Sequence, residues 1–197
     1  MLRKPWIKRP VVLLGLAFNA AYLAYYFFGG AFAGRPAVRQ RKAPDAAAPA
    51  VVSFRGGFDN QTNVYPTEDL MLVKESGRRL QFAPISTASG AAEAPSVVHL
   101  RFYSFAREPQ YQSERQLRMS VDGREVWKST DVVYSLTGGD AEVVESLGGR
   151  IGFAEFERAV NGRVVTLTVG REEIELSPGQ VLALRRMVWC ALGDPCG

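Results

Sequence analysis

The chain has 197 residues and a formal net charge of +4, with 24 lysine and arginine residues against 20 aspartate and glutamate residues. The excess is local, because residues 1–44 hold 8 of the basic residues and no acid, whereas the rest holds 16 basic and 20 acidic side chains. A nucleic-acid-binding domain carries a basic patch of its own, but the signs are interspersed here. The composition therefore argues against nucleic acid as a partner.

The N-terminal segment predicts a membrane anchor. Residues 1–10 form a basic flank, and no charged residue occurs from Val11 to Ala33, which covers the about 20 residues that a transmembrane helix needs. A signal peptide has a shorter apolar region, yet Ala31-Phe32-Ala33 has the small-x-small pattern of a cleavage site. We expect a retained signal anchor at residues 11–33 in the lipid bilayer, with cleavage and secretion as the alternative.

Asn19 is the amide inside this apolar segment, and it could hydrogen-bond to a helix of a membrane partner. Basic residues flank the segment equally, so the positive-inside rule does not choose an orientation. The only two cysteines, Cys190 and Cys196, lie close enough in sequence to pair, since Gly193 and Pro195 let the chain fold back. A disulfide would persist in an oxidising compartment, so we expect the C-terminal domain on the periplasmic side of an inner membrane.

After the anchor, residues 34–50 (GRPAVRQRKAPDAAAPA) are rich in alanine, proline and charge and lack apolar periodicity. Such a composition predicts a tether. Residues 51–197 are long enough for one hydrophobic core and are expected to form the extracytoplasmic domain. Inside it, residues 84–95 (PISTASGAAEAP) are small and polar, which predicts a long surface loop.

Most of the domain is predicted as antiparallel strands. Val97–Ala106 carries apolar side chains on both faces, as a central strand does, and Gln116–Val121 alternates with period two. Asp122-Gly123 supplies the positive φ angles of a type I′ hairpin, so Arg124–Ser129 is expected to return as the partner strand. The other predicted strands are Val51–Arg55, Leu70–Lys74, Arg79–Phe82, Glu142–Leu147, and a hairpin of Arg163–Val169 with Glu172–Leu176.

Two helices are predicted near the C-terminus. Phe153–Val160 places Phe153, Phe156 and Val160 on one helical face. Ser177-Pro178-Gly179-Gln180 combines an N-cap serine, a proline at the first helical position and a glutamine at the third, which is a capping box, and Gly193 ends the second helix. Strands followed by helices predict an α+β fold, with the helices covering one face or end of a mostly antiparallel sheet.

Three stretches taken together resemble a diffuse group of uncharacterised bacterial envelope proteins, either membrane-anchored or secreted. They are FDNQTNV (residues 58–64), VDG (residues 121–123) and FERAVNGRVVTLTVGREEIELSPGQVLALR (residues 156–185). In that group a short helix, a strand hairpin and a C-terminal helix end the domain. The resemblance implies a fold and a location, and it implies no activity.

No residue set predicts catalysis, a cofactor or a metal site. His99 is the only histidine, lies mid-strand beside Arg101, and is expected to be a hydrogen-bonded strand residue rather than part of a triad. One histidine and two C-terminal cysteines do not predict a zinc site. Phe102, Tyr103 and Phe105 are expected in the core rather than as a stacking platform. The glycine pairs match no nucleotide motif and predict turns; they are Gly56-Gly57, Gly138-Gly139 and Gly148-Gly149.

Carboxylates leave an enzymatic alternative open. Glu155, Glu157, Glu172, Glu173 and Glu175 are expected on solvated faces, although two acids converging in the fold could hydrolyse a glycoside. The favoured function is a non-catalytic, membrane-tethered binding or scaffold module of the bacterial cell envelope. The alternatives are an accessory subunit of a membrane complex that contacts its partner through the anchor helix, and an envelope hydrolase that uses unrecognised carboxylates.

Overall fold

The computed structural model describes residues 38–45, 47–55, 61–89, 94–139, 141–194 and 196. The predicted anchor from Val11 to Ala33, with Asn19, lies outside these residues. Among the helices of the described residues, none has the length and hydrophobicity to cross a bilayer.

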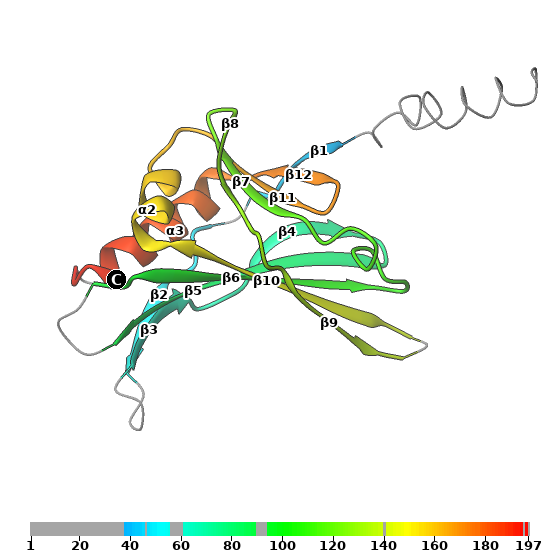
Figure 1. The fold of residues 1–197 in the computed structure, drawn as a ribbon, viewed down its shortest axis with the longest axis horizontal. Coiled ribbons are helices and arrows are strands. Elements are labelled where there is room, and N and C mark those ends of the chain that lie inside the picture. Colours follow the sequence, from blue (N-terminus) through cyan, green and yellow to red (C-terminus); the bar gives the residue numbers. More distant parts are fainter. Residues whose placement is uncertain are drawn as a thin grey trace, which may run out of the picture. The chain divides into compact units, whose positions relative to one another are not determined.

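The larger of two sheets has seven strands (Figure 1). Its order is β2-β3-β5-β6-β10-β9, with β4 also paired to β5, and all of these pairs are antiparallel. The strands are β2 (Val51–Arg55), β3 (Gln61–Pro66), β4 (Leu70–Glu75), β5 (Arg78–Ser89), β6 (Val97–Ala106), β9 (Val133–Gly138) and β10 (Val143–Gly152).

The smaller sheet has five strands in the order β1-β12-β11-β7-β8. β1 runs parallel to β12, and the other neighbours are antiparallel. The strands are β1 (Arg39–Lys42), β7 (Leu117–Val121), β8 (Arg124–Lys128), β11 (Val165–Val169) and β12 (Glu172–Glu175). With two helices, the described residues form the expected mostly antiparallel α+β domain.

The helices α2 (Phe153–Val160) and α3 (Pro178–Ala191) lie together on one side of the larger sheet (Figure 1). α3 contacts β2, β3 and β5, whereas α2 contacts β10 and β7. The capping box is confirmed, since Ser177 Oγ accepts from Gln180 N–H and Gln180 Oε1 accepts from Ser177 N–H. Phe153, Phe156 and Val160 are buried on one face of α2, as predicted.

The core lies between the two sheets and the helices. Alternate residues of β6 (Val98, Leu100 and Phe102) point into it and are at most 1% exposed. The rings of Phe82 and Phe102 stack with centroids 4.8 Å apart. The opposite face of β6 is half-buried or exposed, so the prediction that Tyr103 and Phe105 lie in the core is wrong. Those side chains alternate with the core residues and occupy the outer face of the larger sheet.

The Asp122-Gly123 hairpin is confirmed, with φ angles of 50° and 79° and β7 paired to β8. Both angles are positive, as a type I′ turn requires. A Cβ built on Gly123 would meet no atom within 4 Å. The need for glycine here is therefore a matter of backbone conformation and not of space.

The predicted surface loop at residues 84–95 is wrong in its first half, because β5 continues to Ser89. Pro84, Ser86 and Ala88 alternate as buried residues along this part of β5. Proline is tolerated because β5 pairs with β4 up to Phe82 and with β3 from Ser86 onward, which leaves Pro84 between the two partners. The sequence does alternate between buried and outward-facing positions here, but the buried positions hold small residues, which resemble those of a loop.

The prediction of a tether through Ala50 is also wrong for Arg39–Lys42, which forms β1. The strand has no apolar face, and its cations meet carboxylates of both sheets. Arg41 pairs with Glu75 of β4 and lies 3.5 Å from Glu172 of β12, and Lys42 lies 3.4 Å from Glu175 of β12. Ala43 follows as a core residue. The compact domain therefore begins at Val38.

Gly148-Gly149 was predicted as a turn but lies inside β10. A Cβ on Gly149 would come within 3.0 Å of the Trp127 ring. The Trp127 indole N–H donates to the Arg150 carbonyl at 2.9 Å, beyond the end of β9. Glycine is therefore needed for the close approach of the indole to the strand. β3 and β9 were not predicted, since neither has a strong apolar alternation.

Candidate ligand-binding face

The outer face of the larger sheet carries the residues that we take as the candidate site. We use the name outer face for the side chains of β2, β3, β5, β6, β9 and β10 that alternate with the core residues. His99 on β6 has Ile85 of β5 on one side and Arg150 of β10 on the other. Arg101 follows two positions along β6, on the same face. Residues distant in sequence thus meet at the centre of this face.

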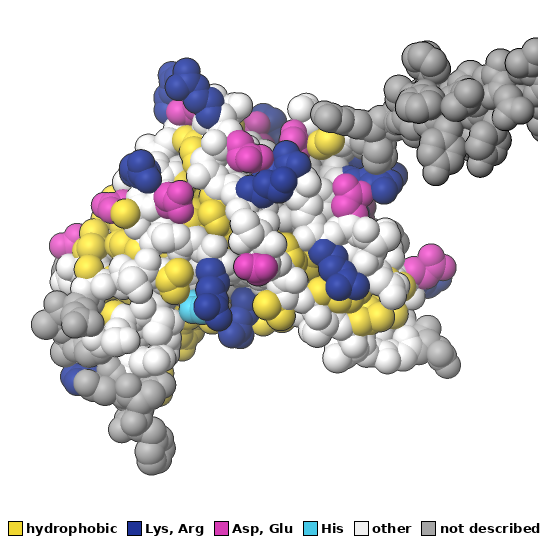
Figure 2. Space-filling view, in the orientation of Figure 1, with side chains coloured by type: hydrophobic (Ala, Val, Ile, Leu, Met, Phe, Trp, Pro, Cys, Tyr) yellow, Lys and Arg dark blue, Asp and Glu magenta, His cyan; other side chains and the backbone are white. Residues whose placement is uncertain are grey.

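Two clefts open on the outer face, and both are lined by His99 and Arg101. The first, about 680 Å³, extends toward the start of β9. It is lined by basic, hydroxyl and aromatic side chains, among them Arg150, Lys128, Ser129, Ser146 and Tyr103. In Figure 2 the histidine borders basic side chains beside a hollow in the surface.

The second cleft, about 450 Å³, extends toward β2 and β3. Phe54 and Tyr65 line it with amide side chains and a threonine. Phe54 is 58% exposed. Asn63 Oδ1 accepts from Thr87 Oγ1 at 2.8 Å, which leaves the amide N–H groups of Asn63 for other acceptors. The two clefts together present apolar rings at one end and cations at the other.

The electrostatics of the centre favour an anion. Burial lowers the pKa of His99, and the guanidinium groups of Arg150 and Arg101 lower it further, so the imidazole is neutral at pH 7. Within the described part of the chain, neither arginine has a carboxylate within salt-bridge distance. The acid among the lining residues is Asp131, which accepts from Thr130 Oγ1 at 3.3 Å.

The buried carboxylates of Glu145 and Glu172 are surrounded by hydrogen-bond donors of the protein, unlike the acid that lines the first cleft. Glu145 is 1% exposed and accepts from the backbone N–H groups of Gln110 at 2.6 Å and Tyr111 at 2.8 Å, and from the Tyr134 hydroxyl at 3.0 Å. These bonds fix the loop between β6 and β7 against β10. A carboxylate with this many donors is satisfied in the folded state, so its role is to position the loop.

The prediction that Glu172 lies on a solvated face is wrong, because it is 7% exposed. Its two oxygens accept from Arg78 Nη1 at 2.7 Å and Nη2 at 3.0 Å, a bidentate pair between β5 and β12. Arg78 Nη2 also donates to the Tyr111 hydroxyl at 2.6 Å. Burial raises the pKa of Tyr111, which keeps this hydroxyl protonated. The network joins the two sheets.

The other predicted acids, Glu155, Glu157, Glu173 and Glu175, are half-buried on their elements. None of them lines either cleft, nor does Glu145 or Glu172. The hydrolase hypothesis thus finds no facing pair of carboxylates in these two clefts. In the part of the chain that the structure describes, no group of three or more His, Cys, Asp or Glu side chains is placed to hold a metal ion.

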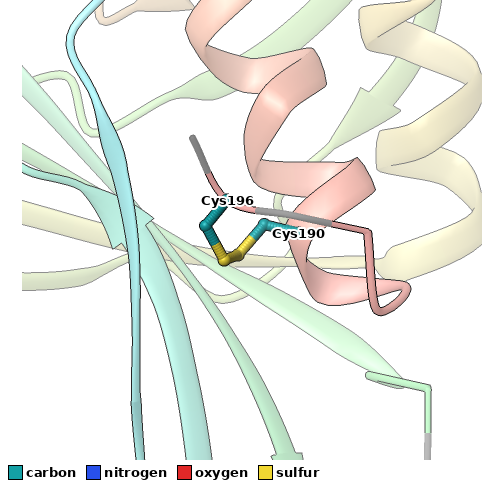
Figure 3. Close-up of a disulfide and its surroundings, with 2 residues drawn as sticks. All are labelled: Cys190 and Cys196. Atoms are coloured by element: carbon teal, nitrogen blue, oxygen red, sulfur yellow. A yellow bond between two sulfur atoms is a disulfide. The ribbon is translucent and has the colours of Figure 1, made fainter.

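Cys190 and Cys196 form a disulfide at the end of α3, with Cα atoms 4.7 Å apart (Figure 3). The chain turns back at Gly193, which has a φ of 100°. Cys190 is 7% exposed, and Cys196 packs against the core. The bond therefore holds Cys196 against the end of α3.

Searches against protein-family models, curated proteins and solved structures found no match to this chain. The resemblance to bacterial envelope proteins therefore stays a prediction.

Proposed function

We propose that this protein is a non-catalytic binding module of the bacterial cell envelope, anchored in the inner membrane by residues 11–33, and that its outer face binds an anionic ligand. The observation that supports the proposal is the pair Arg101 and Arg150, which flank His99 without a carboxylate partner among the described residues. Charges of one sign in a hollow concentrate the field. Arginine also presents a planar fork that suits carboxylate and phosphate groups.

His99 would make the binding depend on pH. In the free protein burial favours the neutral imidazole, and repulsion from the guanidinium groups of Arg150 and Arg101 favours it further. A bound anion would offset that repulsion, so the pKa of His99 rises on binding and a proton is taken up. By linkage, affinity for the anion increases as the pH falls through the His99 titration.

The test uses the only histidine of the chain as its own probe. The imidazole resonances of the full chain are followed by NMR during titration with inorganic phosphate at several pH values. We expect a saturable shift and a higher His99 pKa with phosphate bound. Arg101→Gln with Arg150→Gln should abolish the saturable shift, whereas Arg124→Gln, an exposed arginine on β8, should retain it. A resonance that phosphate does not move, or that moves equally in all variants, contradicts the proposal.

The membrane location rests on the uncharged segment from Val11 to Ala33. Since the compact domain begins at Val38, residues 34–37 alone separate the predicted span from it in the sequence. We expect the full-length protein to stay in the membrane pellet after carbonate washing. A mature protein whose N-terminal sequence starts at Gly34 would establish cleavage instead.

A further inference from the structure

β9 is a free edge of the larger sheet. It pairs with β10 on one side, and none of the described residues pairs with its other side. Its six residues, VYSLTG, carry no charge. Val133 is 74% exposed and Leu136 is 43% exposed. The edge thus combines unpaired backbone groups with exposed apolar side chains.

The other edges of the two sheets carry the charges that usually protect an edge strand. β1 reads RQRK, β8 reads REVWK, and β2 ends in Arg55. β9 has no charge, no proline and no shift in its register with β10. An edge of this kind is a template for another strand.

The hydrogen-bond phase of β9 defines which groups point outward. At the hairpin end, the Gly139 N–H donates to the Glu142 carbonyl at 3.2 Å. In an antiparallel ladder the bonded pairs alternate, so Val133, Ser135 and Thr137 face β10. The backbone N–H and C=O groups of Tyr134 and Leu136 therefore point away from the sheet.

We propose that a second copy of this chain occupies the edge, with the two β9 strands antiparallel about a two-fold axis at Ser135. In this register Tyr134 lies opposite the partner's Leu136, and Leu136 lies opposite the partner's Tyr134. Each pair exchanges both backbone hydrogen bonds, because both residues present outward groups. The strand is thus complementary to itself, which a two-fold interface requires.

The side chains agree with this register. Tyr134 and the partner's Leu136 form an aromatic–aliphatic cross-strand pair, and Val133 and the partner's Thr137 pair on the outer face. Such pairs stabilise a sheet, and no like charges oppose each other along the strand. The two-fold axis stands perpendicular to the sheet, so the outer faces of both copies point to the same side. Two sites on one side would allow one elongated ligand to bind both.

The proposal is tested first by cross-linking the full-length chain in its native membrane. Ser135 would face the partner's Ser135 as a non-bonded pair, where Cα atoms lie about 4.5 Å apart, within the range of a disulfide. Ser135→Cys is expected to form a disulfide-linked dimer on oxidation. Val133→Cys, the matched control on the same face, would oppose the partner's Thr137 and should not link to itself. Equal cross-linking at both positions, or none at Ser135→Cys, would overturn the register.

Self-association is measured by sedimentation of the full-length chain in detergent, up to about 1 mM because a single strand pair is a small interface. We expect a concentration-dependent dimer. Leu136→Pro removes an outward N–H and leaves the ladder to β10 intact, so it should give a monomer with an unchanged circular dichroism spectrum. Leu182→Lys, at an exposed leucine of α3, should dimerise like the wild type. A wild-type chain that stays monomeric at all concentrations refutes the proposal, as does a Leu136→Pro variant that dimerises normally.

Discussion

The pair between Arg78 and Glu172 predicts a large loss of stability when one charge is removed. Both side chains are about nine-tenths buried, with 11% and 9% of their surface exposed. Glu172→Gln keeps the shape of the side chain but replaces one acceptor oxygen by an amide N–H group. The fork of Arg78 then loses one of its two bonds, and its charge stays buried without the carboxylate that accepts both of them.

The expected cost is about 3–5 kcal/mol, the range for breaking a buried pair by removing one partner. Two structural facts place Glu172 in that range and not in the range for surface pairs, which is about 0–1 kcal/mol. Its contact with Arg78 is bidentate, and Arg41 Nε lies 3.5 Å from the same carboxylate. The loss therefore affects two cations.

The measurement is the free energy of unfolding of the full chain from guanidinium titration followed by tryptophan fluorescence. Glu173→Gln is the matched control, since Glu173 lies next on the strand and is half-buried. It should change the free energy by no more than about 0.5 kcal/mol. A double variant, Arg78→Met with Glu172→Met, should cost less than Glu172→Gln, because no unpaired charge remains. A Glu172→Gln variant within about 1 kcal/mol of the wild type would refute the reasoning.

Three further predictions concern single features. Gly123→Val should destabilise the domain by at least about 1 kcal/mol, because valine resists the positive φ, and Gly123→Asn should cost less in the same denaturation assay. The fold lowers the pKa of His99 below its ordinary value of 6.5. The stability that the neutral imidazole contributes is therefore fully present above pH 6.5 and is lost as the pH falls through the lowered pKa. Melting curves from pH 8 to pH 5 should show this loss relative to His99→Gln, and parallel curves would contradict it. Cys196→Ser should lower the free energy of unfolding by about 2 kcal/mol, as expected for a short loop. Alkylation of both Cys190 and Cys196 in the unreduced protein would show that the bond is absent.

The elements that the sequence predicted correctly are those whose signals are local. The capping box at Ser177 and Gln180 is complete within four residues, and it starts α3 where predicted. Asp122-Gly123 dictates its hairpin because two adjacent residues supply the positive φ angles. The helix from Phe153 to Val160 follows from the spacing of its apolar residues, which helical geometry places on one face. In each case the physical cause acts within a turn or two of the backbone.

The elements that only the tertiary structure decided depend on partners far along the chain. β1 pairs in parallel with β12, and its Arg41 and Lys42 meet carboxylates of β4 and β12. A charged strand has no apolar period to reveal it. Glu172 is buried because Arg78 arrives from another sheet.

The candidate site likewise depends on residues that lie far apart in the sequence. His99 and Arg150 are 51 positions apart in sequence and become neighbours through the register of β6 with β10. No spacing in the sequence encodes that register, because it is set by the packing of the opposite faces of the same strands. The length of the chain and its local sequence patterns thus predicted one α+β domain. The pairing of its strands determined which charges meet on the outer face.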